Sequence, residues 1–225
     1  HNVLITGGLG AIGLRLANYA VSQGASKLFL VGRSTQPSPE QRKQLDALVA
    51  KGVSVELIPA DVASLQGIGK LKEALQGNKI ETVFHTAGVD FLSPIADWTR
   101  EDVHRVTEAK IQGAWNLHQW SLTQPIKRFV LTSSIASVWG APSRFLYASA
   151  NAFLDALGPL RRSQNLPVTV LNFGPWAQGG MADEAALAEY VRVGMQGLDP
   201  ERAIQSVGRL VGQGITDAVV TDTQW

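Results

Sequence analysis

Two patterns of apolar residues alternate along this chain. Short continuous apolar runs predict buried β-strands, and longer stretches with an apolar residue every three or four positions predict amphipathic helices. The predicted strands cover residues 3–5, 28–31, 53–58, 82–85, 129–134, 168–173 and 217–221. The predicted helices cover residues 12–24, 38–52, 64–76, 99–120, 145–164, 184–193 and 200–211. This alternation predicts an α/β fold, a doubly wound parallel sheet of about seven strands with helices on both faces.

The helical patterns also predict which side chains begin each helix and which face the core. Ser38 is placed to cap its helix, with Pro39 at the first helical position and Gln41 in capping-box register, and Thr99 is placed to cap the longest helix. The side chains expected to face inward are Leu45, Leu48 and Val49, then Leu65, Ile68, Leu71 and Leu75, and then Val103, Val106, Lys110, Ala114 and Leu117. An ammonium on an apolar face is costly unless it is paired or its stem reaches solvent. Lys110 is therefore either a functional residue or a lysine whose amine reaches water.

Composition narrows the class of protein. The 225 residues are 45% apolar, enough for one large domain with a buried core. A formal net charge of +1 gives no sign of a nucleic-acid or membrane-surface binder. The absence of cysteine excludes disulfides and thiolate zinc sites and suits a cytoplasmic location. No apolar run approaches the roughly 18 residues of a spanning helix. The chain begins inside a predicted strand and stops just after another, so we expect a piece of a longer polypeptide.

A glycine-rich motif, Gly8-x-Gly10-x-x-Gly13, follows the first predicted strand and opens the first helix. This is the context of the dinucleotide-binding fingerprint. There the glycines permit a tight turn, and backbone N–H groups approach a pyrophosphate at the helix N-terminus. The motif predicts a Rossmann-type cofactor site, and a plain tight turn is the alternative.

The residues after the next three strands indicate which dinucleotide binds. The second strand ends in Gly32-Arg33-Ser34, where a cofactor without a 2′-phosphate is usually held by an acidic residue. A guanidinium and a hydroxyl suit a phosphate instead, which predicts NADPH, although a solvated surface arginine is the alternative. An adenine would lie near Asp61 and Val62. The small residues Thr86-Ala87-Gly88 would let a ribose and nicotinamide pack on the backbone.

A hydroxyl, a phenol and a carboxamide gather in one short window of the sequence. Ser134 ends the fifth predicted strand, and Tyr147 and Asn151, four residues apart on the following helix, point the same way. Ligands of open α/β sheets bind at the carboxyl ends of the strands. We therefore expect the chemistry here, with Ser133 as the alternative to Ser134. His85 lies before the end of its strand and is expected to be a packed residue rather than a catalyst.

Residues 177–197 are expected to form a lid. The turn Gly174-Pro175-Trp176 leads the chain over the expected site, and Gly179, Gly180 and Gly194 flank the helical stretch. Glycines on both sides of a polar helix are typical of a segment that closes over a cleft.

With these residues in place, the chain resembles a short-chain dehydrogenase/reductase over essentially its whole length. More narrowly, it is similar to the catalytic part of a ketoreductase domain from a modular type I polyketide synthase. Ordinary short-chain dehydrogenases carry Tyr-x-x-x-Lys on this helix and an asparagine on the preceding long helix. Here Asn151 follows Tyr147 at that spacing and the lysine is Lys110, an exchange characteristic of the synthase ketoreductases. The runs 30–34, 147–157 and 174–177 also look like that family.

The resemblance implies a role for each residue of the window. Tyr147 would protonate the ketone oxygen, and Ser134 would give it a second hydrogen bond, because the family spacing of thirteen residues selects Ser134. Lys110 would favour the phenolate, and Asn151 would orient the lysine or a water that relays protons. The complete cofactor set is Thr6, Gly7, Gly8, Gly10, Ala11, Ile12, Gly13, Arg33, Ser34, Asp61, Val62, Thr86, Ala87, Gly88, Lys110, Tyr147, Pro175 and Trp176.

The substrate implied by the resemblance is a β-ketoacyl thioester on the phosphopantetheine arm of an acyl carrier protein, and the product is the β-hydroxyacyl thioester. The Leu-Asp-Asp signature of the B type would fall where this chain has Asp90-Phe91-Leu92. Trp139 matches the tryptophan of the A type, and Arg144 stands where the A2 subtype has histidine. The pattern resembles A1, which implies an L-hydroxyl without epimerisation. Trp139, Arg144 and Met181 form the expected substrate and stereocontrol set.

Ketoreductases of this family also carry an N-terminal structural half that binds no cofactor, and we expect that half to be absent from this chain. The helices 99–120 and 145–164 would pack on that half, or on each other in a dimer. Other domains of the synthase module would be further partners. The alternatives are a free-standing reductase of small ketones, a non-reducing scaffold or epimerising domain, and a fatty-acid-type megasynthase.

Overall fold

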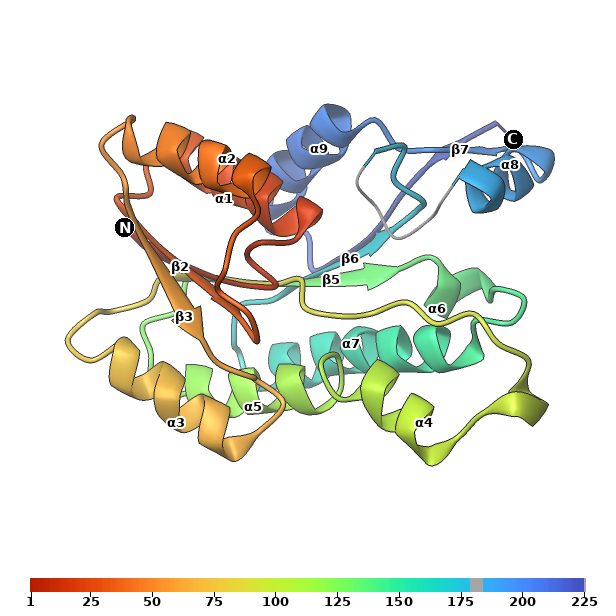
Figure 1. The fold of residues 1–225 in the computed structure, drawn as a ribbon, viewed down its shortest axis with the longest axis horizontal. Helices are drawn as coiled ribbons and strands as arrows, with labels where there is room; N and C mark the ends of the chain where they lie inside the picture. The colour runs from red at the N-terminus through yellow and green to blue at the C-terminus, as the bar shows by residue number, and fades with distance from the viewer. Residues whose placement is uncertain (179–183, 225) are drawn as a thin grey trace. The chain divides into compact units, whose positions relative to one another are not determined.

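Strands and helices alternate through most of the chain (Figure 1). The structure is a computed structural model that describes residues 1–178 and 184–224. Its strands are β1 (Asn2–Thr6), β2 (Lys27–Gly32), β3 (Ser54–Pro59), β4 (Thr82–His85), β5 (Arg128–Ser134), β6 (Thr169–Phe173), β7 (Met195–Gln196), β8 (Asp217–Val220) and β9 (Asp222–Thr223). Its helices are α1 (Ala11–Ser22), α2 (Pro39–Val49), α3 (Leu65–Ala74), the 3₁₀ helix η1 (Ile95–Asp97), α4 (Arg100–Thr107), α5 (Gln112–Ser121), α6 (Ala136–Trp139), α7 (Phe145–Ser163), α8 (Glu184–Arg192) and α9 (Pro200–Gly212).

Hydrogen bonding orders the strands of the main sheet as β3-β2-β1-β4-β5-β6-β8. The pairs β1–β2, β1–β4, β2–β3 and β6–β8 are parallel. This is the strand order of a doubly wound α/β sheet, so the fold class predicted from the sequence is confirmed. Strands β7 and β9 form a separate antiparallel pair that the sequence did not predict. Two residues per strand are too few to show an alternating pattern.

The chain divides into two compact units. Unit 1 comprises His1–Gly88 and Glu108–Val130, and unit 2 comprises Val89–Thr107 and Leu131–Trp225. Unit 1 thus carries the glycine-rich motif and Lys110, and unit 2 carries Ser134, Tyr147 and Asn151.

In unit 1, α1 and α2 cover one face of the strands β3-β2-β1-β4, and α3 and α5 cover the other (Figure 1). Leu4 of β1 pairs in register with Phe29 of β2, and both side chains are fully buried. Strands that are covered on both faces bury every side chain. This burial explains why β1, β2 and β4 read as continuous apolar runs, whereas β3, at the edge of the sheet, is only partly buried and reads as an alternating pattern.

In unit 2, α4 packs against α7, and α7 packs on β6, while α9 lies on the opposite face of β6 and β8 (Figure 1). The backbones of α7 and β6 approach closely at Gly158, where a Cβ atom would lie 2.8 Å from Cγ2 of Val170. Asp199 caps α9 by accepting the Arg202 N–H at 2.9 Å. None of the helices within residues 1–178 and 184–224 is long and apolar enough to cross a membrane.

The single long helix predicted over residues 99–120 is wrong, because the chain forms α4 and α5 with a break at residues 108–111. Thr99 does cap α4, accepting the Asp102 N–H at 3.1 Å. Within the break, the Gly113 N–H donates to the Glu108 carbonyl at 2.8 Å, one residue farther back than in a regular helix. Gly113 sits tightly on its neighbours, since a Cβ there would lie 3.0 Å from Cγ2 of Val62. Close packing of α5 thus favours the interruption.

The predicted cap of α2 is also confirmed, but not every predicted inward position is. Ser38 and Gln41 form the expected capping box. Three side chains expected in the core are exposed, by 54% at Val49, 82% at Leu65 and 37% at Val103. Val49 ends α2 and Leu65 begins α3, so both lie where the helix leaves the sheet. Helical periodicity fixes the direction of a side chain, but it does not show how far the covering surface extends.

The start of α3 provides a test of this packing. At Gly67 a Cβ atom would lie 1.9 Å from the Asp61 carbonyl oxygen, whereas at Gly69, one half-turn on, it would meet nothing within 4 Å. We expect Gly67→Ala to lower the free energy of unfolding by roughly 1–3 kcal/mol through overpacking. Gly69→Ala should raise it by up to about 1 kcal/mol through helix propensity.

Urea unfolding of the two single variants and the unmodified chain measures this difference. The matched substitutions share the same change in composition and in unfolded-chain entropy. Equal stabilities for the two variants would contradict the close approach at Gly67.

Candidate functional site

The glycine-rich turn of unit 1 is shaped by close backbone contacts. Gly7 has a φ of +65°, a conformation that residues with a Cβ atom rarely adopt. A Cβ at Gly13 would lie 2.3 Å from the Gly7 carbonyl oxygen, and one at Gly8 would lie 2.6 Å from Cβ of Leu30. Helix α1 can therefore begin directly against the turn and against β2 only because these positions carry no side chain.

The N-terminus of α1 is suited to an anion. Gly10 is its N-cap, and within the described residues no side chain caps it. The first turn, which includes Ala11 and Ile12, carries no acidic residue. Its backbone N–H groups can therefore donate hydrogen bonds to a phosphate, and the positive end of the helix dipole favours the negative charge. The turn fits the pyrophosphate of a dinucleotide.

The residues predicted to meet the adenosine half lie after β2 and β3. Arg33 and Ser34 are both exposed at the end of β2, where a phosphate can reach them. Asp61 accepts the Ala63 N–H with its Oδ1 at 3.0 Å, and Val62 is buried. Asn116 of α5 holds this turn by donating to the Val62 carbonyl at 2.9 Å.

Gln41 is a contributor to this site that sequence reasoning missed. Its Oε1 accepts the Ser38 N–H at 2.7 Å, as the capping box requires. Its Nε2 donates to the Leu9 carbonyl at 2.8 Å and so joins the start of α2 to the glycine-rich turn. The capping-box signature indicated only the first of these contacts, because the second joins segments 32 residues apart.

Residues 86–88 after β4 pack against the glycine-rich turn and against Lys110. The Thr86 hydroxyl donates to the Thr6 carbonyl at 2.7 Å, and the Ala87 N–H donates to Oγ1 of Thr6 at 3.4 Å. Lys110 is only 3% exposed, and a Cβ at Gly88 would lie 2.6 Å from its Cε. The absence of a side chain at Gly88 thus makes room for the lysine stem.

His85 is a buried strand residue next to this lysine, which agrees with the packed role predicted for it. Its Nδ1 lies 2.7 Å from Oγ1 of Thr6. Burial, together with the positive charge of Lys110, lowers the pKa of His85 from 6.5 to about 3. The ring is therefore neutral at neutral pH.

Ser134, Tyr147 and Asn151 lie together in unit 2, as the sequence predicts. Burial raises the pKa of the Tyr147 phenol above its usual value, while hydrogen bonding from the Ser134 side chain opposes the rise. Asn151 is fully buried, and its Nδ2 donates to the Tyr147 carbonyl at 2.8 Å. Its Oδ1 accepts no hydrogen bond from any residue that the structure describes. A buried amide oxygen without a donor is costly and therefore suits a bound water or cation.

Ser133 belongs to a different environment from Ser134. Its hydroxyl donates to the Asn151 carbonyl at 3.3 Å and accepts from Nδ2 of Asn172 at 3.2 Å. Asn172 also donates to Asp155 at 2.8 Å. Ser133 is thus held in a buried network that joins β5, β6 and α7. Sequence reasoning missed this network, although one asparagine in the apolar run of β6 is a visible signal.

The remaining predicted residues are distributed over unit 2. Trp139 ends α6 and is 47% exposed, and Arg144 is the N-cap of α7. The Pro175 carbonyl accepts the Leu198 N–H at 2.7 Å, and Trp176 is buried with its ring 5.1 Å from that of Phe173. Met181 and part of the predicted lid lie outside the described residues. Lys110 belongs to unit 1, so its pairing with Tyr147 stays a prediction.

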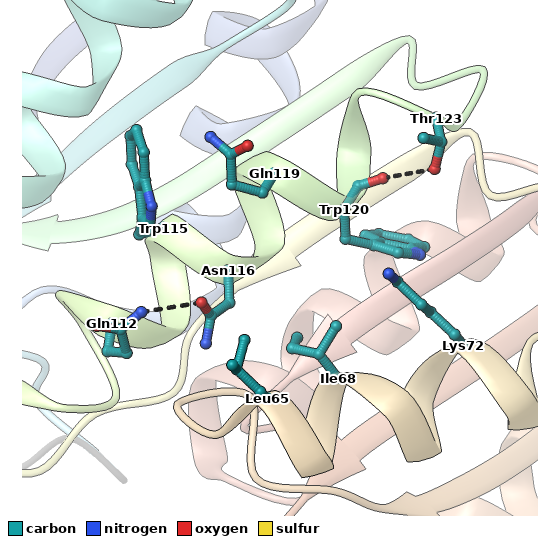
Figure 2. Close-up of a pocket in the computed structure, with 9 residues that line it drawn as sticks. All are labelled: Leu65, Ile68, Lys72, Gln112, Trp115, Asn116, Gln119, Trp120 and Thr123. Atoms are coloured by element: carbon teal, nitrogen blue, oxygen red, sulfur yellow. Dashed lines mark hydrogen bonds between the residues drawn. The ribbon is translucent and has the colours of Figure 1, made fainter.

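A groove of about 380 Å³ lies between α3 and α5 in unit 1 (Figure 2). The exposed Leu65 lines it together with Ile68 and Trp120, and Gln112 and Asn116, one turn apart on α5, are joined by a hydrogen bond of 2.9 Å. No predicted catalytic or cofactor residue lines it.

Known proteins are similar to this chain in sequence. The sequence model of the family described as KR domain matches residues 2–178. The polyketide synthase GfsA of Streptomyces halstedii is 37% identical over 228 residues, which cover 99% of this chain and 3% of that protein. The erythronolide synthase EryA3 of Saccharopolyspora erythraea is 36% identical over 224 residues, which cover 98% of this chain and 7% of that protein.

Solved structures share the fold. An A1-type ketoreductase superposes with a TM-score of 0.93 at 34% identity, covering 100% of this chain and 48% of that one. The first ketoreductase of the tylosin polyketide synthase gives a TM-score of 0.89 at 35% identity, covering 100% and 49%. This chain thus spans about half the length of these solved chains and a small part of the synthases it matches.

The low pKa of His85 predicts how stability depends on pH. The folded chain keeps His85 neutral down to a pKa of about 3, whereas in the unfolded chain it titrates near 6.5. Because the unfolded state takes up the proton first, we expect the free energy of unfolding to fall as the pH drops below about 6.5. Urea unfolding between about pH 4 and 8 measures the slope.

His85→Gln removes the titrating group and should flatten this slope, whereas His104→Gln, at an exposed position on α4, should leave it unchanged. A His85→Gln variant with the same slope as the unmodified chain would show that another group causes the acid sensitivity.

Proposed function

The chain belongs to the KR domain family, the ketoreductase domains of polyketide synthases, and from this premise we propose that it reduces a β-ketoacyl thioester with NADPH. The product is the β-hydroxyacyl thioester. The observation that carries the proposal is the group formed by Ser134, Tyr147 and Asn151 at the end of β5 and on the first turns of α7. In this proposal both units together form the catalytic domain.

NADPH, held by the residues named below, would supply the hydride that reduces the β-carbon of the substrate. Negative charge then develops on the ketone oxygen, and Tyr147 donates its phenolic proton to that oxygen. Ser134 supplies a second hydrogen bond, a kind of contribution worth roughly 3–4 kcal/mol in the transition state. The support for Ser134 rather than Ser133 is that the Ser133 hydroxyl is engaged in the buried network with Asn151 and Asn172.

A phenol buried as Tyr147 is must be helped to give up its proton, because burial raises its pKa. We assign this help to Lys110, whose ammonium would stabilise the phenolate. The unfilled Oδ1 of Asn151 would accept a hydrogen bond from that ammonium or from a water that returns a proton to the phenol. This role gives the buried carboxamide oxygen the donor it needs.

Domains of this family use a nicotinamide dinucleotide as cofactor. The choice of NADPH rests on Arg33 and Ser34. Their exposed position after β2 lets a guanidinium and a hydroxyl bind the 2′-phosphate. Gly10 and the N-terminus of α1 would hold the pyrophosphate. Thr86 to Gly88 would support the nicotinamide half, and Pro175 and Trp176 would border it.

We propose A-type stereochemistry, with an L-hydroxyl product formed without epimerisation. The support is Trp139, the absence of a Leu-Asp-Asp run near Asp90, and likeness to an A1-type structure. The substrate would arrive on an acyl carrier protein, and the other domains of a synthase module, including a structural half, would be the partners.

Two other functions stay open to the same experiments. A free-standing reductase would turn over a free diketone but not a carrier-bound ketoacyl chain. A non-reducing domain would fail to bind NADPH in a fluorescence titration.

Removal of one oxygen atom tests the central role. We expect Tyr147→Phe to lower kcat for reduction of a 3-ketoacyl thioester by about 10²–10⁴-fold, because the proton donor is lost. NADPH affinity, measured by fluorescence, should change little. Tyr19→Phe, the same change on α1, should keep full turnover. Retained turnover in Tyr147→Phe would contradict the proposal.

The cofactor preference is tested at Arg33. Arg33→Ala should weaken NADPH binding by about 10–100-fold, since a charge-assisted phosphate contact is lost, and should leave NADH binding nearly unchanged. Equal weakening of both cofactors would show that Arg33 does not read the 2′-phosphate. Arg42→Ala, at an exposed position on α2, serves as the charge-matched control.

A further inference from the structure

The segment after β4 is fastened to the start of α7 by two contacts that the proposed mechanism does not use. Arg144, the N-cap of α7, makes an ion pair with Asp90, and the two side chains are only 14% and 16% exposed. Directly beside this pair, the Ser93 N–H donates to the Ser143 carbonyl at 2.9 Å. Ser143 has a φ of 55°, an unfavourable value for a residue with a Cβ atom. The backbone is thus held in a strained conformation where the segment attaches.

Aromatic contacts extend the attachment, and we call residues 90–98 the anchored segment. The Trp98 ring lies 5.7 Å from that of Phe145, and its Nε1 donates to the Ser93 carbonyl at 3.2 Å. At the other end, the Arg105 guanidinium lies over the Phe91 ring at 5.0 Å. Within this segment, Asp90 is the residue whose charge meets an opposite charge on α7.

Asp90 and Arg144 also act on the phenol of Tyr147, which lies three residues after Arg144. The negative charge of Asp90 raises the pKa of Tyr147, and the positive charge of Arg144 lowers it. The two charges thus act on the phenol in opposite directions, and loss of either one alone would shift its acidity.

We propose that Asp90 and Arg144 are a pair of positioning residues that anchors residues 90–98 on the start of α7 and balances the charge beside Tyr147. The inference rests on the proposed function only in giving Tyr147 its catalytic role. The pair does not touch the reacting atoms in this proposal; it acts through the phenol.

Other charges near the phenol leave this assignment intact. Helix α4, which packs against α7, carries Arg100, Glu101, Asp102, His104 and Arg105, and Asp102 is paired with Arg105 at 3.0 Å. Helix α6 and strand β6, which also pack on α7, carry no charged residue. Lys110, in the proposed mechanism, would act equally on every variant considered below.

The test is a titration of Tyr147 by NMR in the whole chain, with ¹³C-labelled tyrosine and Tyr147→Phe to assign the signal among three tyrosines. Asp90→Asn removes the negative charge, so the midpoint should fall by roughly 0.5–1 pH unit. Arg144→Gln removes the positive charge, so the midpoint should rise by a similar amount. The double variant should return near the midpoint of the unmodified chain.

Turnover gives the same test in functional terms. Reduction requires the protonated phenol, so the pH at which kcat falls to half on the alkaline side should move down in Asp90→Asn and up in Arg144→Gln. A merely structural pair would give both variants the same loss of kcat and no opposite shifts. Asp102→Asn, which breaks the exposed pair on α4, should move neither profile.

Hydrogen exchange tests the anchoring separately. The Ser93 amide should exchange at least 10-fold faster in both single variants than in the unmodified chain. Midpoints that move in the same direction, or that stay unmoved, would overturn the charge balance, and unchanged Ser93 exchange would overturn the anchoring. A chain without reductase activity that still shows the opposite shifts would refute the proposed function but not the pair.

Discussion

The buried ammonium of Lys110 is the constraint on which the predicted cofactor-binding residues of unit 1 around it depend. A charge that is 3% exposed is costly, so its surroundings must be arranged around it. Gly88 leaves room for the stem, and His85 is held neutral by its own burial and also by the positive charge of Lys110 beside it, which together lower its pKa. The helix also breaks at this residue, between α4 and α5. Three local features that look unrelated in the sequence, at Gly88, at His85 and between α4 and α5, therefore lie around one buried lysine.

In unit 2, the end of the buried strand β5 places Ser134 beside the phenol of Tyr147 on α7. The carboxamide of Asn172 fills the hydrogen-bonding capacity of Ser133 and joins it to Asp155. With Ser133 held in this way, the adjacent Ser134 turns toward Tyr147. Adjacent serines thus serve separate purposes, because successive strand residues point to opposite faces.

Much of the site could be predicted from the sequence because its signals are local. The glycine spacing, the capping box of Ser38 and Gln41, and the four-residue step from Tyr147 to Asn151 each depend on neighbours in the chain. The contacts that the sequence did not reveal join distant segments, as when Gln41 reaches the Leu9 carbonyl or Asp90 pairs with Arg144. A residue pattern gives no distance between such segments.

The sequence by itself determined the parallel α/β fold, the order of its elements and the place of the glycine-rich turn, because hydrophobic period, caps and glycines act within a few residues. Only the tertiary structure decided where the long helix breaks, that Leu65 lies in the open, and which carboxylate Arg144 meets. Those outcomes depend on how closely backbones approach and on which charges are buried together, and both are properties of packing in three dimensions.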